Sequence, residues 1–493
     1  MKLSKLLEKI EYEVQKGDVD TEIASIAYDS RKVQENAVFV CLSGSRTDGH
    51  EFVEEVIKKG AKAVVVEKDV TVKEDITVIK VKDSRYALSL ISAAYFDYPA
   101  EKIKTIGITG TKGKTTTTYM IKSILETAGI PTGLIGTIEC IIGEEHRSAK
   151  NTTPESYDIQ ESLSKMVKAG MKAVVMEVSS QGLKLHRVAG MQFDYGIFTN
   201  LEEDHIGKDE HADFAEYMYC KSLLFQHCKQ GIFNADSEHL DGILKGHTCE
   251  VETYGFSENA DLVATKVALL KEDGKIGVKY HVGGKADFDV DVNVPGRFSV
   301  YNSLAAITLC RHFSVSVSDI QKALAKVSVK GRIELLPVSE DYTLMIDYAH
   351  NAMALENLLV TLKEYEPKRL ICLFGCGGNR AKSRRYEMGE VSAKLADFTV
   401  VTSDNPRYEQ PIEIINDILT GVKKVGGNYV AIPDRKEAIA YCIQHAQKGD
   451  VIVLAGKGHE DYQEIKGKKY HMDERELVQE VLKEHNMAIS AQN

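Results

Sequence analysis

The sequence predicts an α/β protein with three domains. Its 493 residues correspond to about three domains of ordinary size. Short apolar segments rich in Val and Ile alternate with helical segments along most of the chain. This alternation indicates mainly parallel sheets with helices on both faces. We expect an N-terminal α/β domain at residues 1–100, a central domain at 101–332 and a C-terminal domain at 333–493.

The N-terminal domain is expected to end near Tyr98-Pro99. In this domain short strands alternate with helical segments. The strands and helices of this alternation read IASIAYDSR, AVFVCL, FVEEVIKKG and AVVVE. The central domain is expected to contain a doubly wound sheet, a β-rich stretch at 251–294 and a helix from near Tyr301. Its candidate strands lie at 105–109, 172–178 and 194–199.

The C-terminal domain is expected to be a second doubly wound sheet of the Rossmann-like type. Apolar segments again alternate with helical ones. The candidate strands lie at 343–347, 369–374, 397–402 and 451–455.

The stretch TIGITGTKGKTTTT, residues 105–118, carries the strongest functional signal. A β-branched strand is followed by a tight turn with Gly110, Gly113 and Lys114, and then by a helix that opens with Thr115. Backbone N–H groups in such a turn bind phosphate, the lysine adds positive charge, and a threonine hydroxyl can hold Mg²⁺. A glycine-rich turn that binds nothing does not explain this order of residues. We therefore expect a central sheet of the P-loop type, although its glycine spacing is shorter than the Walker form.

Polar residues follow the central strands, where open α/β sheets bind ligands. Glu177 and Ser179 follow one strand, and Asn200 and His205 follow the next. Glu177 and His205 are candidate Mg²⁺ neighbours, with His205 acting through water because Mg²⁺ prefers oxygen ligands. A single Glu or His at a strand end is usually a surface or capping residue, but the joint placement beside a phosphate loop favours a metal site. Lys221, taken alone, is typical of a solvated helix lysine.

Three loops of the C-terminal domain follow apolar strands and predict a ligand site. They read GCGGNR (375–380), SDNPRYE (403–409) and AGKGHE (455–460). Two guanidinium groups and an acid suit a small ligand with carboxylates and an ammonium group. Gly and Asn-Pro also form turns without a ligand, but three such loops favour binding. The side chains expected at this rim are Arg380, Asn405, Arg407, Lys457, His459 and Glu460.

The composition of the chain argues against several classes of binding partner. The net charge of −11 disfavours non-specific binding to nucleic acid. Nine scattered cysteines indicate reduced thiols and a cytoplasmic protein, and Cys372 and Cys376 lack the companions of a zinc site. No run of 18 apolar residues is present, so we expect no membrane span. We also expect a monomer.

A long series of short motifs resembles the Mur ligase family over essentially the whole chain. A lone phosphate loop is common, whereas this series in this order is highly specific. The resemblance implies three domains: the first binds the UDP end of a nucleotide sugar, the second binds ATP, and the third binds an amino acid. The motifs are YDSR (28–31), GTKGKTT (110–116), NTTP (151–154), EVSSQGL with Arg187 (177–187), NLEEDH (200–205), the lysine of YCKSLLF, NAD (234–236), PGRFSVYNSLAA (295–306), GRIE (331–334), DYAH (347–350), GCGGNR, DNPR and GKGHE.

The resemblance also implies roles for individual residues. The implied catalytic residues are Lys114, Glu177, His205 and Lys221. The implied Mg²⁺ neighbours are Thr115, Glu177, His205 and Lys221, the last as a carbamate, which turns its cation into a carboxylate-like anion. The implied ATP contacts are Gly110, Thr111, Lys112, Gly113, Lys114, Thr115, Thr116, Asn302, Arg332 and Asp347. Those of the UDP-muramoyl-dipeptide are Ser30, Thr152, Thr153, Ser179 and Arg187. Those of diaminopimelate are Arg380, Asp404, Asn405, Pro406, Arg407, Gly456 and Glu460.

The implied reaction is an ATP- and Mg²⁺-dependent amide ligation in peptidoglycan precursor synthesis. The γ-phosphoryl group would move to the D-Glu side-chain carboxylate of UDP-N-acetylmuramoyl-L-alanyl-D-glutamate, and the amine of meso-2,6-diaminopimelate would attack the acyl phosphate. Lysine lacks the second carboxylate and would leave Arg407 without its anion, which favours diaminopimelate. The alternatives are the same reaction with L-lysine, a folylpolyglutamate or cyanophycin-type ligase, and a catalytically silent nucleotide-binding paralogue.

The chain departs from the family pattern at three places. Leu185 stands where the family often has Gln, and Asn351-Ala352-Met353 replaces Thr-Pro-Asp after DYAH. GKDEH follows the DH of NLEEDH, and His211 aligns as the second histidine of that segment.

Overall fold

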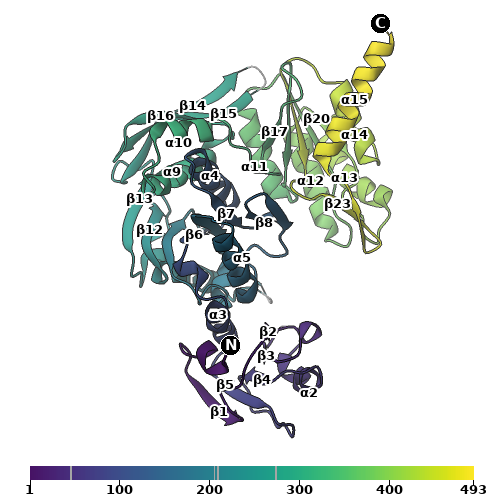
Figure 1. The fold of residues 1–493 in the computed structure, drawn as a ribbon. Helices are drawn as coiled ribbons and strands as arrows, with labels where there is room; N and C mark the ends of the chain where they lie inside the picture. The colour runs from purple at the N-terminus through teal and green to yellow at the C-terminus, as the bar shows by residue number, and fades with distance from the viewer. Residues whose placement is uncertain (45–46, 205, 208–209, 273–274, 493) are drawn as a thin grey trace. The chain divides into compact units, whose positions relative to one another are not determined.

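The chain forms two compact units. The first comprises Met1–Val263 with Leu304–Asp319, and the second comprises Ala264–Ser303 with Ile320–Asn493. The computed structural model describes residues 1–44, 47–204, 206–207, 210–272 and 275–492, and Figure 1 gives the labels of the elements.

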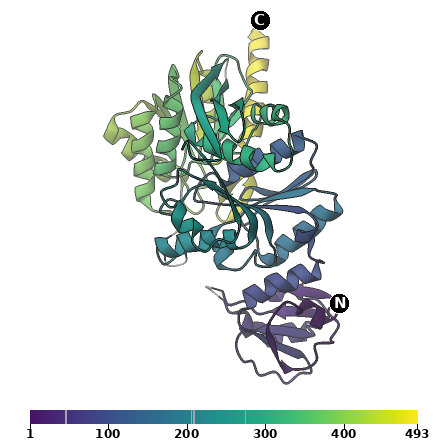
Figure 2. The same ribbon diagram turned by 90° about the vertical axis from the view of Figure 1, so that its left-hand side faces the viewer.

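The N-terminal part of the first unit is a five-stranded sheet covered on both faces. Its elements are α1 (Leu3–Leu6), β1 (Tyr12–Lys16), β2 (Ser25–Ala27), η1 (Ser30–Lys32), β3 (Ala37–Val40), η2 (Gly49–Phe52), α2 (Val53–Lys58), β4 (Ala63–Val66), β5 (Thr77–Val81), α3 (Ser84–Tyr95) and η3 (Pro99–Glu101). The strand order is β1-β5-β4-β3-β2, and only β1 is antiparallel to its neighbour. Leu88 and Ile91 of α3 pack on one face, and Val53 and Val56 of α2 pack on the other. Figure 2 shows the ribbon of this part, coloured purple to blue, from a second side.

The central part of the first unit is a larger, mostly parallel sheet. Its elements are β6 (Lys104–Thr109), α4 (Lys114–Thr127), β7 (Thr132–Ile135), β8 (Glu139–Ile142), β9 (Glu145–Ser148), α5 (Ser156–Lys168), β10 (Ala173–Glu177), α6 (Ser180–Lys184), β11 (Phe193–Phe198), α7 (Phe214–Ser222), η4 (Leu223–Gln226), β12 (Cys228–Asn234), α8 (Leu240–Leu244) and β13 (Glu250–Gly255). The strand order is β13-β12-β11-β6-β10-β7-β8-β9, and the sheet continues past β13 into the start of β14 (Leu262–Glu272), which is parallel to it. All pairs from β13 to β7 are parallel, and β8 and β9 add an antiparallel hairpin.

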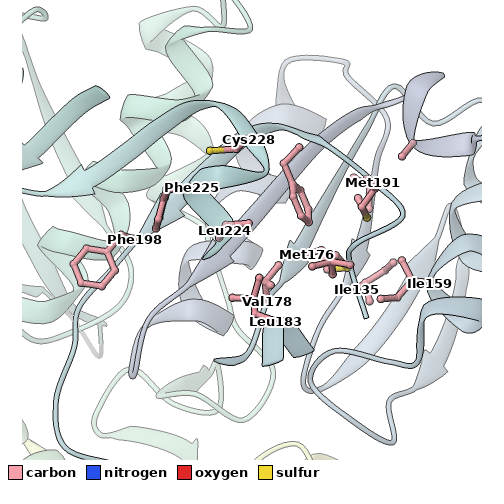
Figure 3. Packing of buried hydrophobic residues seen from close by; sticks show 14 of the residues in the cluster. Ile135, Ile159, Met176, Val178, Leu183, Met191, Phe198, Leu224, Phe225 and Cys228 are labelled. Atoms are coloured by element: carbon pink, nitrogen blue, oxygen red, sulfur yellow. The ribbon is translucent and has the colours of Figure 1, made fainter. Parts of the chain in front are cut away.

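Strands β6 and β10 lie at the middle of this sheet and are buried almost throughout. They read as continuous apolar runs because helices cover both of their faces. Figure 3 shows part of the core on the sheet, where Met176 and Val178 pack among Ile135, Leu183 and Leu224. This packing holds the carboxyl end of β10, where Glu177 stands, and the phosphate loop follows the neighbouring strand β6.

The second unit contains another parallel sheet and a β-hairpin region. Its elements are β14 (Leu262–Glu272), β15 (Lys275–Gly284), β16 (Phe288–Val292), α9 (Arg297–Arg311), α10 (Val317–Leu324), β17 (Glu334–Leu336), β18 (Thr343–Asp347), α11 (Ala352–Lys363), β19 (Arg369–Phe374), α12 (Lys382–Leu395), β20 (Phe398–Val401), α13 (Pro411–Val425), β21 (Tyr429–Ala431), α14 (Arg435–Gln444), β22 (Asp450–Ala455), β23 (Tyr462–Ile465), β24 (Lys468–His471) and α15 (Glu474–Gln492). Strand β14 and helices α9 and α10 lie partly in the first unit. The C-terminal sheet has the order β17-β18-β22-β19-β20-β21, with only β17 antiparallel.

Helices cover both faces of the C-terminal sheet, as the sequence predicts. One core cluster joins β18, β19 and β22 to α11, α12 and α13, and a second joins the other face of the same strands to α14 and α15. The predicted fold class, three α/β sheets of which two are doubly wound, is confirmed. The boundaries at 1–100, 101–332 and 333–493 stay a prediction. Among the described residues, no helix is long and apolar enough to cross a membrane.

Two expected helix starts are wrong by a few residues. The helix of the phosphate loop already begins at Lys114, because Gly113 in the left-handed conformation serves as its N-cap residue. The helix expected from near Tyr301 begins at Arg297, directly after Pro295-Gly296.

Replacing Asp450 by Asn tests a buried ion pair at the start of the C-terminal sheet. Asp450 is 1% exposed and opposes Arg369 across β22 and β19; its Oδ1 accepts from Arg369 Nε at 3.0 Å, and its Oδ2 accepts from Gln447 N at 2.7 Å. Asp450→Asn removes the buried carboxylate charge from its hydrogen bonds with Arg369, whose side chain is 32% exposed, so we expect a loss of about 2 kcal/mol in the free energy of unfolding. Urea denaturation followed by circular dichroism measures it.

The matched control is Asp341→Asn. Asp341 lies 3.9 Å from Lys448, and both side chains are exposed, so the expected loss is below about 0.5 kcal/mol. Equal midpoints for the two variants would contradict a stabilising role of the buried pair.

Candidate functional site

The turn between β6 and α4 is built around the carbonyl group of Gly110. Gly110 has φ 151°, and a Cβ at this position would lie 1.9 Å from Thr199 Oγ1, so a side chain does not fit. The Gly110 oxygen accepts hydrogen bonds from Lys114 Nζ at 2.9 Å and from Lys221 Nζ at 2.8 Å. The turn thus brings two lysine side chains, more than 100 residues apart in sequence, to one oxygen atom.

Asn200, at the end of β11, holds the other side of this turn. Its carbonyl oxygen accepts from Thr111 N at 2.9 Å, and its Oδ1 accepts from Lys112 N at 2.8 Å. The Lys112 ammonium pairs with Glu202 Oε2 at 2.6 Å. The predicted phosphate loop and the polar residues after β11 therefore form one structure, as expected for neighbouring parallel strands.

Glu177 faces the start of α4 from the end of β10. Its side chain is buried, and it accepts from Thr115 Oγ1 and from Thr137 N, both at 2.9 Å. A carboxylate beside a threonine hydroxyl offers the hard oxygen ligands that Mg²⁺ prefers. His205 lies outside the described residues, and the described residues contain no group of three or more His, Cys, Asp or Glu side chains arranged for a metal.

Lys221 is buried, with 2% of its surface exposed, so the prediction that it is a solvated helix lysine is wrong. It lies on α7, and its Nζ is 4.4 Å from the centre of the Tyr217 ring. Burial, reinforced by the positive charge of Lys114, lowers the pKa of Lys221 well below its usual value of 10.5. A lysine with a lowered pKa is more often a neutral amine, which is the form that reacts with carbon dioxide.

Four of the five residues implied for the UDP-muramoyl-dipeptide lie next to Glu177. Thr153 Oγ1 donates to the Glu177 carbonyl at 3.0 Å and accepts from Ser179 N at 2.9 Å. Arg187 Nη1 donates to the Thr153 carbonyl at 2.9 Å. The hydroxyl of Thr152 lies 3.1 Å from that of Thr137, which also binds Glu177. The fifth, Ser30, lies in η1, where its carbonyl accepts from Lys59 Nζ at 2.8 Å.

The departures from the family pattern have structural roles. His211 is fully buried, and its Nε2 lies 2.9 Å from Ser180 Oγ. Leu185 is the C-cap residue of α6. Asn351 is the N-cap of α11, where its Oδ1 accepts from Ala354 N at 2.9 Å.

Arg332 and Asp347 lie together in the second unit. The guanidinium carbon of Arg332 is 5.0 Å from the centre of the Tyr348 ring, and Asp347 accepts from Ile333 N and Ala349 N, both at 2.8 Å. Burial raises the pKa of Asp347, although the Arg332 charge opposes this. Asn302 is buried in α9.

The three loops of the C-terminal sheet surround a cavity of about 600 Å³. Arginine and carboxylate groups share its wall, so the cavity has separate places for anionic and cationic parts of a ligand. Its lining includes six of the seven residues implied for diaminopimelate: Arg380, Asp404, Asn405, Arg407, Gly456 and Glu460. The seventh, Pro406, is buried in the same loop.

The environment of Arg407 corrects one expectation. Its Nε pairs with Glu464 Oε2 at 3.1 Å, and its Nη1 donates to the Gly378 carbonyl at 2.7 Å. The expectation that Arg407 lacks an anion unless a second substrate carboxylate is present is therefore wrong. Its Nη2 donates to no protein group among the described residues, so one edge of the guanidinium stays open to a ligand.

Sequence reasoning missed several side chains at this cavity. Arg384 lines the cavity. Behind its loops lies a buried ion pair, in which Arg435 Nε donates to Glu474 Oε1 at 2.8 Å. Arg435 also donates to the carbonyls of Ser403, at 2.9 Å, and Ala455, at 3.0 Å, which are the first residues of two of the loops. Arg384 stands beside the GCGGNR motif and could have been noticed there, whereas nothing in the spacing of Arg435 marks it.

Comparison with known proteins gives the family of the chain. It matches the models of the Mur ligase family catalytic domain (residues 22–96), the Mur ligase middle domain (108–310) and the Mur ligase glutamate ligase domain (331–458). A relative from Clostridium perfringens is 43% identical over 98% of this chain and 99% of its own, and one from Caldanaerobacter subterraneus is 44% identical over 98% and 99%. The chain belongs to the Mur ligase family.

The similar proteins share a more specific name. Both relatives are named UDP-N-acetylmuramoyl-L-alanyl-D-glutamate–2,6-diaminopimelate ligase. A solved structure of a ligase with this name has a TM-score of 0.73 and 26% identity, with 99% of each chain covered. Mur ligases form amide bonds with the help of ATP, so the chain is an ATP-dependent ligase.

The lowered pKa of Lys221 predicts how stability changes with pH. Between the folded-state pKa and 10.5, the unfolded chain binds more protons than the folded chain, so the free energy of unfolding rises with pH. Lys221→Met removes this rise, whereas Met at the exposed Lys168 leaves it unchanged. Urea denaturation in buffer free of carbon dioxide, over alkaline pH, measures the slope; equal slopes for wild type and Lys221→Met would contradict the lowered pKa.

Proposed function

We propose that the protein joins meso-2,6-diaminopimelate to UDP-N-acetylmuramoyl-L-alanyl-D-glutamate in peptidoglycan precursor synthesis. The observation that carries this proposal is the cavity of the C-terminal sheet, where arginines and carboxylates together line a volume of about 600 Å³. Such a wall suits an amino acid with two carboxylates and two ammonium groups. The names of relatives that are 43–44% identical over nearly the whole chain support the same substrates.

The phosphate loop is proposed to bind ATP. Backbone N–H groups at the N-terminus of α4 would hold the phosphates, and Lys114 would turn from the Gly110 carbonyl to the β- and γ-phosphates. Asn302, Arg332 and Asp347 are proposed as contacts of the nucleoside. Thr115, Glu177, His205 and a carbamylated Lys221 are proposed to hold Mg²⁺, which when bound neutralises phosphate charge.

Thr152, Thr153, Ser179 and Arg187 are proposed to position the dipeptide end of the nucleotide sugar, and Ser30 its UDP end. The first four gather around Glu177, so a carboxylate held there would lie on the same edge of the sheet as the phosphate loop. Transfer of the γ-phosphoryl group would give an acyl phosphate, whose phosphate is a good leaving group when an amine attacks. Lys114 would stabilise the charge that develops between the two anions.

The open edge of Arg407 is proposed to hold the distal carboxylate of diaminopimelate. Lysine has no group for this edge. Since Glu464 already neutralises part of the Arg407 charge, discrimination would come from lost hydrogen bonds rather than from an unpaired charge. We also propose that the enzyme is monomeric and cytoplasmic, the latter supported by nine free cysteines.

The proposed function predicts which amino acid supports ATP consumption. Phosphate release should require both UDP-muramoyl-dipeptide and diaminopimelate, with kcat/KM for lysine at least about 10-fold lower. Arg407→Lys should raise the KM for diaminopimelate roughly 10- to 100-fold, because charged hydrogen bonds of that size are lost, while the KM for ATP stays unchanged. A phosphate-release assay with a panel of amino acids measures both.

The matched control for Arg407→Lys is Arg147→Lys. Arg147 also pairs with a glutamate, at 2.6 Å from Glu145 Oε1, but lies on the exposed β9, and its substitution should change neither KM. No phosphate release with any amino acid would refute the ligase function, and equal rates with lysine would refute the selectivity.

Carbamylation of Lys221 is testable by isotope labelling. With labelled bicarbonate, wild type should show one carbamate signal that is absent in Lys221→Met, because the buried amine is the reactive group. The same variant should lose roughly 100-fold in kcat, since a charge at the phosphate site is removed. Full activity without any carbamate signal would contradict this modification.

A further inference from the structure

Lys457 is a fully buried cation at the C-terminal site with no assigned role. It follows Gly456 at the end of β22, its surface exposure is 0%, and it does not line the cavity. A buried lysine is costly unless its charge and its hydrogen bonds are satisfied. The surroundings of Lys457 therefore indicate what keeps it there.

All three N–H groups of the Lys457 ammonium are used within the protein. Nζ donates to Asn405 Oδ1 at 3.0 Å, to Glu460 Oε2 at 2.8 Å and to the Tyr462 carbonyl. A second carboxylate, Asp404, lies 3.8 Å away. An ammonium group has three donors, so Lys457 has none left for a substrate.

These three partners come from three separate segments of the chain. Asn405 belongs to the loop after β20, Glu460 to the loop after β22, and Tyr462 begins the β23–β24 hairpin. That hairpin also carries Glu464, the partner of Arg407. Lys457 thus joins the segments that form the wall of the cavity.

The contacts of Lys457 set the orientation of two side chains. Asn405 Oδ1 accepts from Lys457 and, at 2.8 Å, from Glu464 N, which turns its Nδ2 toward Glu460 Oε2 at 2.9 Å. Glu460 Oε2 therefore receives two hydrogen bonds from the protein, while Oε1 receives none among the described residues. Because Glu460 lines the cavity, this second oxygen is available to a ligand.

We propose that Lys457 is a positioning residue for the amino-acid substrate, fixing Asn405 and Glu460 so that the second oxygen of Glu460 receives an ammonium group of diaminopimelate. The inference rests on the proposed function. It separates two roles within one motif: Glu460 touches the substrate, and Lys457 acts only through Glu460 and Asn405.

The test compares Lys457→Met with Lys469→Met. Lys469 lies on the same hairpin, and its Nζ is 3.7 Å from the centre of the Tyr462 ring, but its side chain is exposed. Lys457→Met should raise the KM for diaminopimelate roughly 30-fold, as expected when one partner of a buried charge pair is lost, with little change in the KM for ATP or the nucleotide sugar. Lys469→Met, which removes the same charge, should leave all three KM values unchanged.

A double-mutant cycle distinguishes positioning from general support. If Lys457 acts through Glu460, Lys457→Met in a Glu460→Gln background should raise the KM less than about 3-fold further. Lys457→Arg keeps the charge but not the three contacts, so it should give an intermediate KM and serves where Lys457→Met fails to fold. Circular dichroism melting curves identify folded variants.

Two results would overturn the inference: an unchanged KM for diaminopimelate in folded Lys457→Met and Lys457→Arg, or fully additive effects in the cycle. Absence of activity in wild type with diaminopimelate would instead refute the proposed function. Active wild type with an unaffected Lys457 variant refutes the positioning role alone.

Discussion

The approach of β6 to β11 at Gly110 is the constraint on which the turn before α4 and the residues around it depend. Only a residue without a side chain allows the turn to pass Thr199 so closely. The Gly110 carbonyl then accepts hydrogen bonds from Lys114 of the next helix and from Lys221 of a helix distant in the sequence. Burial, and after it the positive charge of Lys114, lowers the pKa of Lys221. One steric requirement therefore sets the geometry of the turn and contributes to the chemical state of a distant lysine.

The fold could be predicted from the sequence because its main signals are local. Buried parallel strands read as uninterrupted apolar runs, and β18 and β19 have the predicted bounds of 343–347 and 369–374. Helix starts were less accurate, since they depend on cap residues such as Gly113. The hairpins β8–β9 and β23–β24 were missed because one strand of each, β9 and β24, is mostly exposed and polar and carries no apolar pattern.

The candidate site could be predicted only in part. Whether a residue could be located depended on whether the strand order or the side-chain packing places it. Topology brings the carboxyl ends of parallel strands to one edge, so residues after these strands, such as Glu177 and Asn405, could be located from strand positions alone. Partners of buried charges cannot be located in this way. Arg407 meets Glu464 through a hairpin, and Arg435 reaches two strand-end carbonyls from α14. Such pairs depend on side-chain packing between segments that lie far apart in the sequence.

Two buried lysines show why residue type alone could not give their roles. Lys221 donates to a carbonyl and has another lysine as its electrostatic neighbour, so burial and repulsion both favour the neutral amine. Lys457 donates to one carboxylate and lies 3.8 Å from another, so its contacts connect acidic side chains of different segments. The first environment suits a lysine that reacts, and the second suits a lysine that holds other groups in place. Both lysines stand in motifs of the sequence, but only the folded chain supplies the neighbouring charges that separate their roles.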